Sequence, residues 1–374
     1  MTAPRFLQIH TLHSYTASLL NRDEAGQAKR LVYGGTPRTR ISSQCLKRHW
    51  RMAEHDPYAL QKLSGYVESF RSRDLVTQLV SGPLRARFEH EIVDAIEAGF
   101  QRFIYGPKGD QGRKTRAPLL LGQPELNWLA RNAEEIAMKC ESPKAARQAV
   151  DALTKTANFK VMAQSAALPG GLTAALFGRM VTSDVEANIE APIYVAHAFS
   201  VHEAEVEGDF FSAVDDLAVL PSVRTTDTLQ QTEIGNGLFY GYVVIDMPGL
   251  IRNCAGDRAL AGSVVRSLIH LIAEVSPGAK RGSTAPFGRA DLVLLEAGDR
   301  QPRSLATAYR VAIPHCPEVA IDKLAEELRM QDEAYATNEE RAHLSIRTPL
   351  PEVTRFSIGA LADWGAGIVS RVEA

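Results

Sequence analysis

The order of strand-like and helix-like segments is the feature of this sequence that most limits its fold. Residues 5–13 mix β-branched, aromatic and apolar side chains and are predicted to form a strand. Residues 41–53 are predicted to form a helix, because apolar residues recur there at helical spacing. Strand character returns in residues 172–181, 193–201, 238–247 and 291–296, and an amphipathic helix is expected in residues 258–275. The order strand, helix, strand, strand, helix, strand, interrupted by large insertions, predicts an α+β fold of the ferredoxin-like or RRM-like kind, which often presents single-stranded RNA on its sheet.

Two long segments interrupt this order. Residues 55–160 show helical spacing of apolar residues in several places and are predicted to be mainly helical, with a loop rich in glycine and basic residues at 106–116. Residues 201–238 are acidic and then rich in threonine and glutamine. Because a structureless loop of that length is unusual in a compact domain, we expect a projecting hairpin there. Residues 21–39 are expected to form a polar connection that turns at its Gly-Gly and Pro residues.

The formal net charge of −2 conceals a strong partition of charge along the chain. Residues 25–53 contain no Asp or Glu, and their basic residues are Lys29, Arg30, Arg38, Arg40, Lys47, Arg48 and Arg51. Residues 181–223 contain nine acids and no Lys or Arg, and residues 318–340 form a second acidic stretch. Because the local field steers a polyanion, the basic segment can bind phosphate on a near-neutral protein, although charge blocks are also common on ordinary solvated surfaces.

The densest basic motif is TPRTRISSQCLKR at residues 36–48. Ser42 or Ser43 can cap the helix that follows, and a helix N-terminus accommodates a phosphate because its N–H groups are unpaired. Gln44 adds an uncharged donor, and the basic side chains would supply affinity for a nucleic-acid backbone. An ordinary capped helix with a solvated basic face explains the same residues equally well.

Two other basic segments are further candidates. Lys280 and Arg281 follow a Pro-Gly-Ala turn, where they would make a second phosphate contact or simply face solvent. The loop at residues 106–116 could touch the RNA or a DNA target strand through its basic side chains, which are Lys108, Arg113, Lys114 and Arg116.

No cofactor, metal site or catalytic constellation is expected from the residues. The four cysteines are far apart and form no CxxC pair, which argues against a zinc site or a disulfide framework. The loop at 106–116 lacks the GxxxxGK[ST] pattern of a phosphate-binding loop, and the adjacent Asp215 and Asp216 diverge in direction. No apolar run is long enough to span a bilayer and no signal core begins the chain, so a cytoplasmic location without a membrane partner is expected.

Eight short motifs occur together in the order, and at roughly the spacing, of one known family. They are LNRD (20–23), RISSQCLKR (40–48), FGRMVTS (177–183), AHA (196–198), FSAVDDL (211–217), GLFY (237–240), PGAKR (277–281) and APF (285–287). On these residues the chain resembles the CasC family, the backbone subunits of type I-E CRISPR Cascade complexes, over residues 6–296.

The resemblance implies a protein shaped like a right hand. Residues 1–54, 166–200 and 237–374 would form an RRM-like palm, the last part with C-terminal helices. Residues 55–165 would be a helical fingers insertion, and residues 201–236 a thumb hairpin. Several copies would line up along the guide RNA, and each thumb would pass between nucleotides and turn a base out.

The resemblance also implies which residues contact RNA. Met180 would wedge beside the displaced nucleotide, as apolar side chains do when they unstack a step, whereas the residue type alone, without the resemblance, favours a core methionine. The candidate contacts to the RNA are Arg22, Arg38, Arg40, Ser42, Ser43, Gln44, Lys47, Arg48, Arg51, Arg179, Lys280 and Arg281.

The expected function is therefore non-catalytic binding of a guide RNA (crRNA), whose bases pair with target DNA. The expected partners are further copies of the chain, a 5′-end cap subunit, small and large Cascade subunits, and a recruited helicase–nuclease. The alternative is an RNA endonuclease similar to type III backbone subunits, which would use Asp23 and a divalent metal ion. A free-standing RRM protein is disfavoured because no RNP1-like aromatic run occurs.

Overall fold

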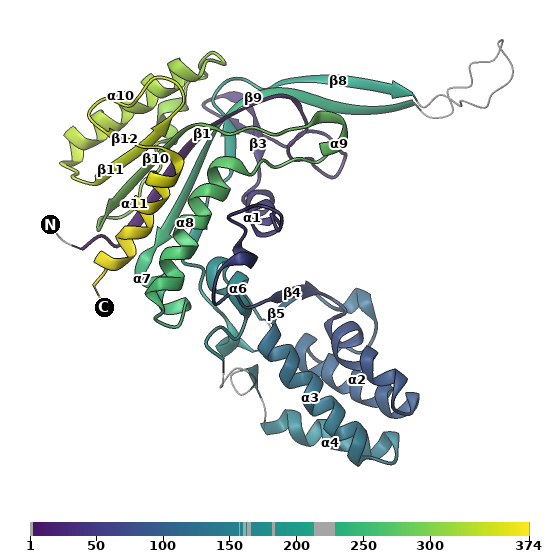
Figure 1. Cartoon of the computed structure of the whole chain (residues 1–374). Helices are drawn as coiled ribbons and strands as arrows, with labels where there is room; N and C mark the ends of the chain where they lie inside the picture. Colours follow the sequence, from purple (N-terminus) through teal and green to yellow (C-terminus); the bar gives the residue numbers. More distant parts are fainter. Residues whose placement is uncertain are drawn as a thin grey trace, which may run out of the picture. The chain divides into compact units, whose positions relative to one another are not determined.

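The computed structural model describes residues 3–156, 158–159, 162, 166–181, 184–212 and 229–373 (Figure 1). The chain divides into two compact units. Unit 1 comprises Met1–Leu60, Val195–Ile245 and Gly262–Ala374, and unit 2 comprises Gln61–Tyr194 and Asp246–Ala261. Unit 2 therefore contains residues 61–165 of the predicted fingers insertion together with residues 166–194 and 246–261, which were expected in the palm, whereas residues 55–60 belong to unit 1.

A large sheet forms the centre of unit 1. Its strands follow the order β12-β11-β10-β1-β9-β7-β3-β2. Their bounds are β1 (Phe6–Ser18), β2 (Arg30–Tyr33), β3 (Thr36–Ile41), β7 (Ala198–Ser200), β9 (Leu229–Asp246), β10 (Ala290–Gly298), β11 (Glu340–Ser345) and β12 (Thr354–Arg355). The short strand β6 (Ile193–Val195) precedes β7, so the predicted strand at 193–201 is broken in two.

The four central strands carry the predicted topology. In chain order, β1 is followed by α1 (Ser43–Arg51), β7, β9, α8 (Arg258–Glu274) and β10. In the sheet these strands lie in the order β10-β1-β9-β7, with β1 antiparallel to β10 and β7 antiparallel to β9. This is the βαββαβ arrangement of a ferredoxin-like sheet. The α+β fold class predicted from the segment order is confirmed.

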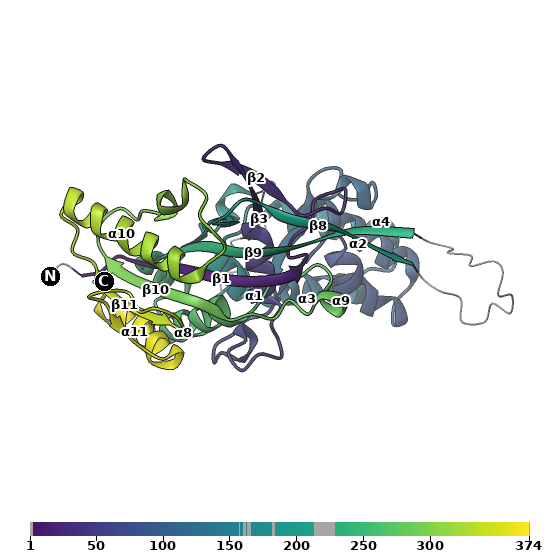
Figure 2. The same cartoon turned by 90° about the horizontal axis from the view of Figure 1, so that it is seen from above.

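Helices cover both faces of this sheet (Figures 1 and 2). On one face, Leu12 and Leu294 pack with Leu324 in a core formed with η6 (Ala306–Tyr309) and α10 (Pro317–Tyr335). On the other face lie α8 and α11 (Ile358–Arg371), where Gly365 approaches Ile269 and Leu7. The central strands therefore offer no open platform on which bases could stack, in contrast to the expectation from an RRM-like fold.

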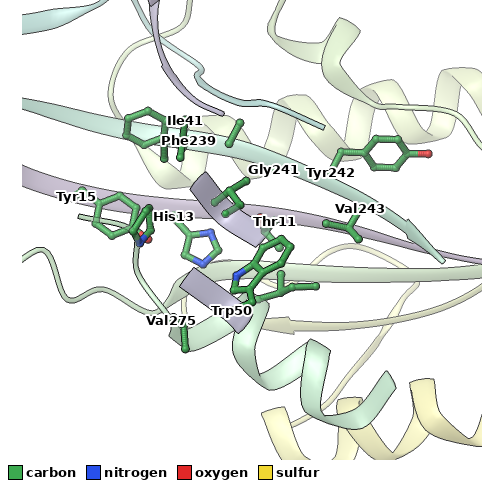
Figure 3. A pocket seen from close by; sticks show the side chains of 14 residues that line it. Thr11, His13, Tyr15, Ile41, Trp50, Phe239, Gly241, Tyr242, Val243 and Val275 are labelled. Carbon is green, nitrogen blue, oxygen red and sulfur yellow. The ribbon is translucent and has the colours of Figure 1, made fainter. Parts of the chain in front are cut away.

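The apolar side of α1 packs on the same face of the sheet as α8. Trp50 is buried and, with Leu46, faces Thr11 of β1 and Ile272 of α8. These side chains enclose a cavity of about 30 Å³ (Figure 3), which is the size of a single water molecule. The cavity is thus a packing defect beneath α1 and is too small for a ligand.

The projecting hairpin expected at residues 201–236 is present in its described part. β8 (Glu205–Ser212) pairs antiparallel with the first half of β9, from Glu205 opposite Asn236 to Ser212 opposite Leu229. Figure 1 shows the two strands extending away from the rest of the sheet. Residues 213–228, which include Asp215 and Asp216, lie outside the described residues.

Two segments differ from the sequence prediction. Residues 172–181 were predicted to form a strand, but Gly171–Phe177 form the helix α6. The prediction is wrong because a short run that is buried on all sides has no periodicity that separates strand from helix. Residues 21–39 contain the β2–β3 hairpin rather than a plain connection, and Gly34 and Gly35 form its turn with φ of +60° and +80°.

Unit 2 is built mainly of helices. Its core is formed by side chains of η2 (Val76–Ser81), α2 (His90–Tyr105), α3 (Gln123–Lys139) and α4 (Pro143–Thr156). The strands β4 (Ser69–Ser72) and β5 (Leu119–Gly122) pair antiparallel. The remaining short elements along the chain are η1 (Leu60–Lys62), η3 (Gly82–Ala86), η4 (Arg113–Thr115), η5 (Val185–Ala187), α7 (Met247–Asn253) and α9 (Arg281–Thr284). None of the described helices is both long and apolar enough to cross a membrane.

A buried charge network holds the middle of the unit 1 sheet. Glu296 of β10 is fully buried and accepts hydrogen bonds from His10 Nε2 at 3.0 Å, Arg303 Nη1 at 2.6 Å and Arg341 Nε at 2.7 Å. The hydroxyl of Tyr240 donates to His10 Nδ1 at 2.9 Å. These contacts join β1, β9, β10 and β11, and the hydrogen bonds and positive charges hold the pKa of Glu296 well below its usual value despite its burial.

The substitution Glu296→Ala is expected to destabilise the protein by about 3–5 kcal/mol, because it leaves the poorly exposed guanidinium group of Arg303 without its carboxylate partner and removes the acceptor of Arg341 Nε. Urea unfolding followed by circular dichroism measures this loss. The matched control is Glu340→Ala, which removes a half-exposed partner of Arg371 and should cost less than about 1 kcal/mol. Equal losses in the two variants would contradict the role of Glu296.

Stability is expected to fall as the pH is lowered from 7 to 5.5. Burial lowers the pKa of His10 below its ordinary value of 6.5, so in this range the unfolded chain binds a proton that the folded chain does not. The substitution His10→Gln keeps a donor toward Glu296 and removes the titration, so the free energy of unfolding should depend less steeply on pH. Parallel pH profiles of the two proteins would contradict this.

Candidate nucleic-acid interface

The start of α1 is held by intramolecular acceptors. Ser42 is the N-cap residue, as predicted, and its Oγ accepts from the backbone N–H of Cys45 at 3.3 Å. The Ser42 N–H donates to Asn21 Oδ1 at 2.9 Å, and the Ser43 N–H donates to His197 Nδ1 at 3.1 Å. Because these three amide groups of the first turn already have acceptors within the chain, they are not free to bind a phosphate. Both serine residues are buried, and the side chain of Ser42 serves as the cap.

Basic side chains gather around α1 from four separate segments of unit 1. Partial desolvation lowers the pKa of His197, and the positive charges of Arg40, Lys29 and Lys47 lower it further. Burial raises the pKa of Cys45, and this rise is opposed by the charges of Lys29, Arg48 and Arg281. We call the surface formed by Lys29, Arg40, Lys47, Arg48 and Arg281 the α1 cationic surface.

The charges of the α1 cationic surface are largely uncompensated. Among the described residues, no carboxylate lies within salt-bridge distance of Lys29, Arg40, Arg48 or Arg281. Arg48 and Arg281 are exposed, and Arg40 and Lys47 are half-buried. Such a surface has a strong local positive potential although the whole chain is near neutral, and a polyanion would be drawn to it.

The turn around Arg281 is tied to the end of β1. The N–H of Ala279 donates to Leu19 O at 2.8 Å, and Arg281 Nη2 donates to Ser276 O at 3.2 Å. Arg281 is the first residue of the four-residue helix α9. Lys280, the residue before it, is half-buried. The structure thus brings this predicted pair of basic residues next to α1, from more than 200 residues away in the sequence.

The loop before β2 carries the LNRD residues. Asp23 Oδ1 accepts from the N–H groups of Ala25 and Gln27, both at 2.9 Å, so its carboxylate stabilises the turn. The Ala28 N–H donates to Glu233 Oε2 at 2.9 Å, which ties the loop to the base of the β8–β9 hairpin. Arg22 is exposed on this loop. Among the described residues, no group of three His, Cys, Asp or Glu side chains could hold a metal ion.

The structure corrects the predicted contact of Arg38 with RNA. Its side chain is completely buried, and Nη1 donates to Ser200 O at 3.1 Å while Nη2 donates to Tyr309 O at 3.1 Å. The guanidinium group is therefore used to join β3, β7 and η6. A direct contact between Arg38 and a phosphate is not compatible with this burial.

Arg179 is a second correction. It lies in unit 2, and its Nη1 donates to both carboxylate oxygens of Glu125 at 2.7 Å while Nε and Nη2 donate to Ala187 O. This buried ion pair satisfies the guanidinium group inside unit 2, away from solvent. Arg179 thus stabilises the segment that carries Met180 and does not face RNA itself.

Met180 lies at the surface and not in the core. Its side chain is 77% exposed and lines a hollow of about 280 Å³ with Arg71 and Tyr105 of unit 2. The alternative of a core methionine is therefore wrong, while the predicted wedge between nucleotides stays a prediction. Gln44 is exposed and Arg51 half-buried on α1, as a role at the same surface requires.

Two residues of the interface were missed in the sequence. Lys29 belongs to the acid-free stretch of residues 25–53, but it is not among the predicted RNA contacts. His197 occurs in the AHA motif, but no role is predicted for it from the sequence. The absence of acids between residues 25 and 53 was the signal that could have identified Lys29. No local signal identifies His197, because its role depends on a hydrogen bond to Ser43 across the fold.

The comparisons with known proteins agree with this fold. One solved chain, titled "CRISPR RNA-guided surveillance complex, pre-nicking", has a TM-score of 0.77 and 24% identity, with 98% of this chain and 100% of that chain covered. Another, titled "CRISPR RNA-guided surveillance complex", has a TM-score of 0.60 and 20% identity, with 97% and 98% covered. No curated protein matches.

The similarity to these structures establishes the fold, and the sequence itself establishes the family. The family described as CT1975-like protein matches residues 7–363, which is almost the whole length of the chain and includes both units. The chain therefore belongs to the CT1975-like protein family.

Proposed function

We propose that this protein is a non-catalytic backbone subunit of a type I-E CRISPR surveillance complex that binds the guide RNA. Two observations support the proposal at the level of the whole chain. The family match spans residues 7–363, and the fold is similar over nearly its full length to chains of CRISPR RNA-guided surveillance complexes.

The α1 cationic surface is the single observation that carries the binding role. Its side chains come from the loop before β2, β3, α1 and the turn at α9, so only the folded protein assembles them. Arginine and lysine bind phosphate oxygens without reading bases, which suits a protein that must accept guides of any sequence. Base pairing would then be left to the guide itself, as in other RNA-guided systems.

The proposed assembly uses the remaining features of both units. Several copies would bind successive segments of one crRNA, with the β8–β9 hairpin as the thumb and the exposed Met180 as the wedge beside a displaced nucleotide. The target DNA strand would pair with the bases that stay in place. The cap, small and large subunits would complete the complex, and cleavage would be the task of a recruited helicase–nuclease.

The endonuclease alternative is less well supported. Asp23 already accepts two backbone N–H groups and shapes its own loop. A carboxylate that positions a metal ion normally acts with further acidic or histidine ligands, and no such group is found among the described residues.

Neutralising the α1 cationic surface is expected to weaken binding of crRNA. With about five phosphates engaged per subunit, the log–log dependence of affinity on salt should have a slope near −3.5. The double substitution Arg40→Ala and Arg48→Ala should reduce the magnitude of this slope by about 1.4, since each lost phosphate contact removes about 0.7 from the slope. Fluorescence anisotropy with labelled crRNA at several salt concentrations measures the slope.

The matched control removes the same charge elsewhere on unit 1. Lys323 and Arg329 are exposed on α10, and each pairs with a neighbouring acid of the same helix. Substituting both with alanine should leave the salt slope unchanged. If both double variants lose affinity and slope equally, the binding is a general charge effect and the α1 cationic surface is not the RNA site.

The assembled complex is expected to leave a complementary RNA uncut in the presence of Mg²⁺. Denaturing gel electrophoresis of an end-labelled target RNA provides the measurement. Regularly spaced cuts that disappear in an Asp23→Ala variant, with RNA binding intact, would instead establish the endonuclease.

A further inference from the structure

A second functional surface lies on the opposite flank of the unit 1 sheet from the α1 cationic surface. A hollow of about 460 Å³ opens between α10, β11 and the residues around β12. Leu328, Leu350 and Val353 give it apolar walls, and its charged lining includes Asp332, Glu339 and Arg341. The volume is within the range of sites that bind small ligands or inserted side chains.

Glu339 is the unusual group in this hollow. Its side chain is only 5% exposed, and its Oε2 atom has no hydrogen-bond donor in the described structure. Arg341 Nη2 forms an ion pair with this oxygen at 3.6 Å, which is too long for a hydrogen bond, and the same nitrogen donates to Asp332 Oδ1 at 2.7 Å. Because a buried carboxylate oxygen without a hydrogen-bond donor is costly, an N–H group supplied by a ligand would stabilise it.

The charge of the lining selects the kind of partner. Its acids are Glu326, Asp332, Glu339 and Glu352, and its cations are Arg329 and Arg341. Both arginines are already occupied, Arg329 by Glu333 and Arg341 by Asp332 and Glu296. Two of the acids are paired as well, Glu326 with Lys323 and Asp332 with Arg341, so the negative charge that remains belongs mainly to Glu339 and Glu352. The remaining potential is negative, so a nucleic-acid phosphate would be repelled and a cationic group attracted.

We propose that this hollow is a docking pocket for an arginine side chain supplied by a protein partner. The guanidinium group carries its donors in a planar fork and pairs with carboxylates at short distance, which meets the need of Glu339. The aliphatic stem of the arginine and a neighbouring apolar residue of the partner would pack on Leu350 and Val353. The proposal does not depend on the proposed binding of RNA, and it assigns a use to the second acidic stretch of the sequence.

The direct test measures binding of a tripeptide to the full-length protein by isothermal titration calorimetry. The probe is acetyl-Leu-Arg-Leu-amide, and the neutral control is the same peptide with citrulline in place of arginine. Because citrulline has the same shape but no charge, the arginine peptide should bind at least about tenfold more tightly. Equal affinities, or no heat from either peptide, would overturn the proposal.

Two substitutions that each remove one negative charge distinguish a specific role of Glu339 from a general effect of the acidic surface. Glu339→Gln should abolish the preference for arginine over citrulline, while Glu352→Gln, at the exposed rim of the same hollow, should reduce it at most about twofold. A preference that survives in the Glu339→Gln protein would overturn the assignment. Neither substitution should change crRNA affinity, since both residues are remote from α1 in the sheet order.

A pair of bulky substitutions tests the place of binding even if Glu339→Gln fails to fold. Glu339 also lines a smaller hollow of about 160 Å³. Thr354 is exposed at the rim of the larger hollow and Asn338 at the rim of the smaller one. Thr354→Trp should abolish binding of the arginine peptide and Asn338→Trp should not. The reverse result would overturn the location, and tighter binding of acetyl-Leu-Lys-Leu-amide would overturn the specificity for arginine.

Discussion

Coverage of both faces of the unit 1 sheet is the constraint on which the rest of the structure depends. Leu12 and Leu294 belong to the core under η6 and α10, and Leu7 lies beneath α11 on the other face. The Glu296 network adds buried charge to the same layer, where it is satisfied by hydrogen bonds. Because apolar and charged groups alike are sealed inside, a chain as large as RNA can reach only the margins of the sheet. The cationic side chains lie at such a margin, around α1.

Arginine residues have two different roles in this protein, stabilising the interior or remaining available at the surface. The groups around each arginine decide which role it has. Arg38 and Arg179 are buried, and the terminal guanidinium nitrogens of each donate to carbonyl or carboxylate oxygens of the same unit. Arg40 and Arg48 have no carboxylate partner among the described residues. The first pair stabilises the fold, since leaving such donors unsatisfied in the interior would be costly. The second pair stays available for phosphate, which is the chemical basis of the proposed binding of RNA.

The two margins of the sheet carry charge of opposite sign. Lys29, Arg48 and Arg281 dominate the side of α1, whereas Glu339 and Glu352 face the hollow beside α10. A net charge of −2 therefore averages two distinct surfaces. Separation of this kind would let one chain hold the proposed RNA and the proposed protein partner at the same time without competition between them. Each surface also repels the ligand of the other, which adds specificity.

The sequence by itself determined the order of the four central strands with α1 and α8, a serine cap at residue 42 or 43 and the hairpin around β8, because periodicity, cap chemistry and segment length are local properties. The acid-free stretch near α1 was visible for the same reason. Only the tertiary structure decided that Arg38 turns inward, that His197 occupies the Ser43 amide and that Arg281 joins α1. Each of these depends on partners far away in the chain, and no local pattern encodes which distant groups folding will bring together.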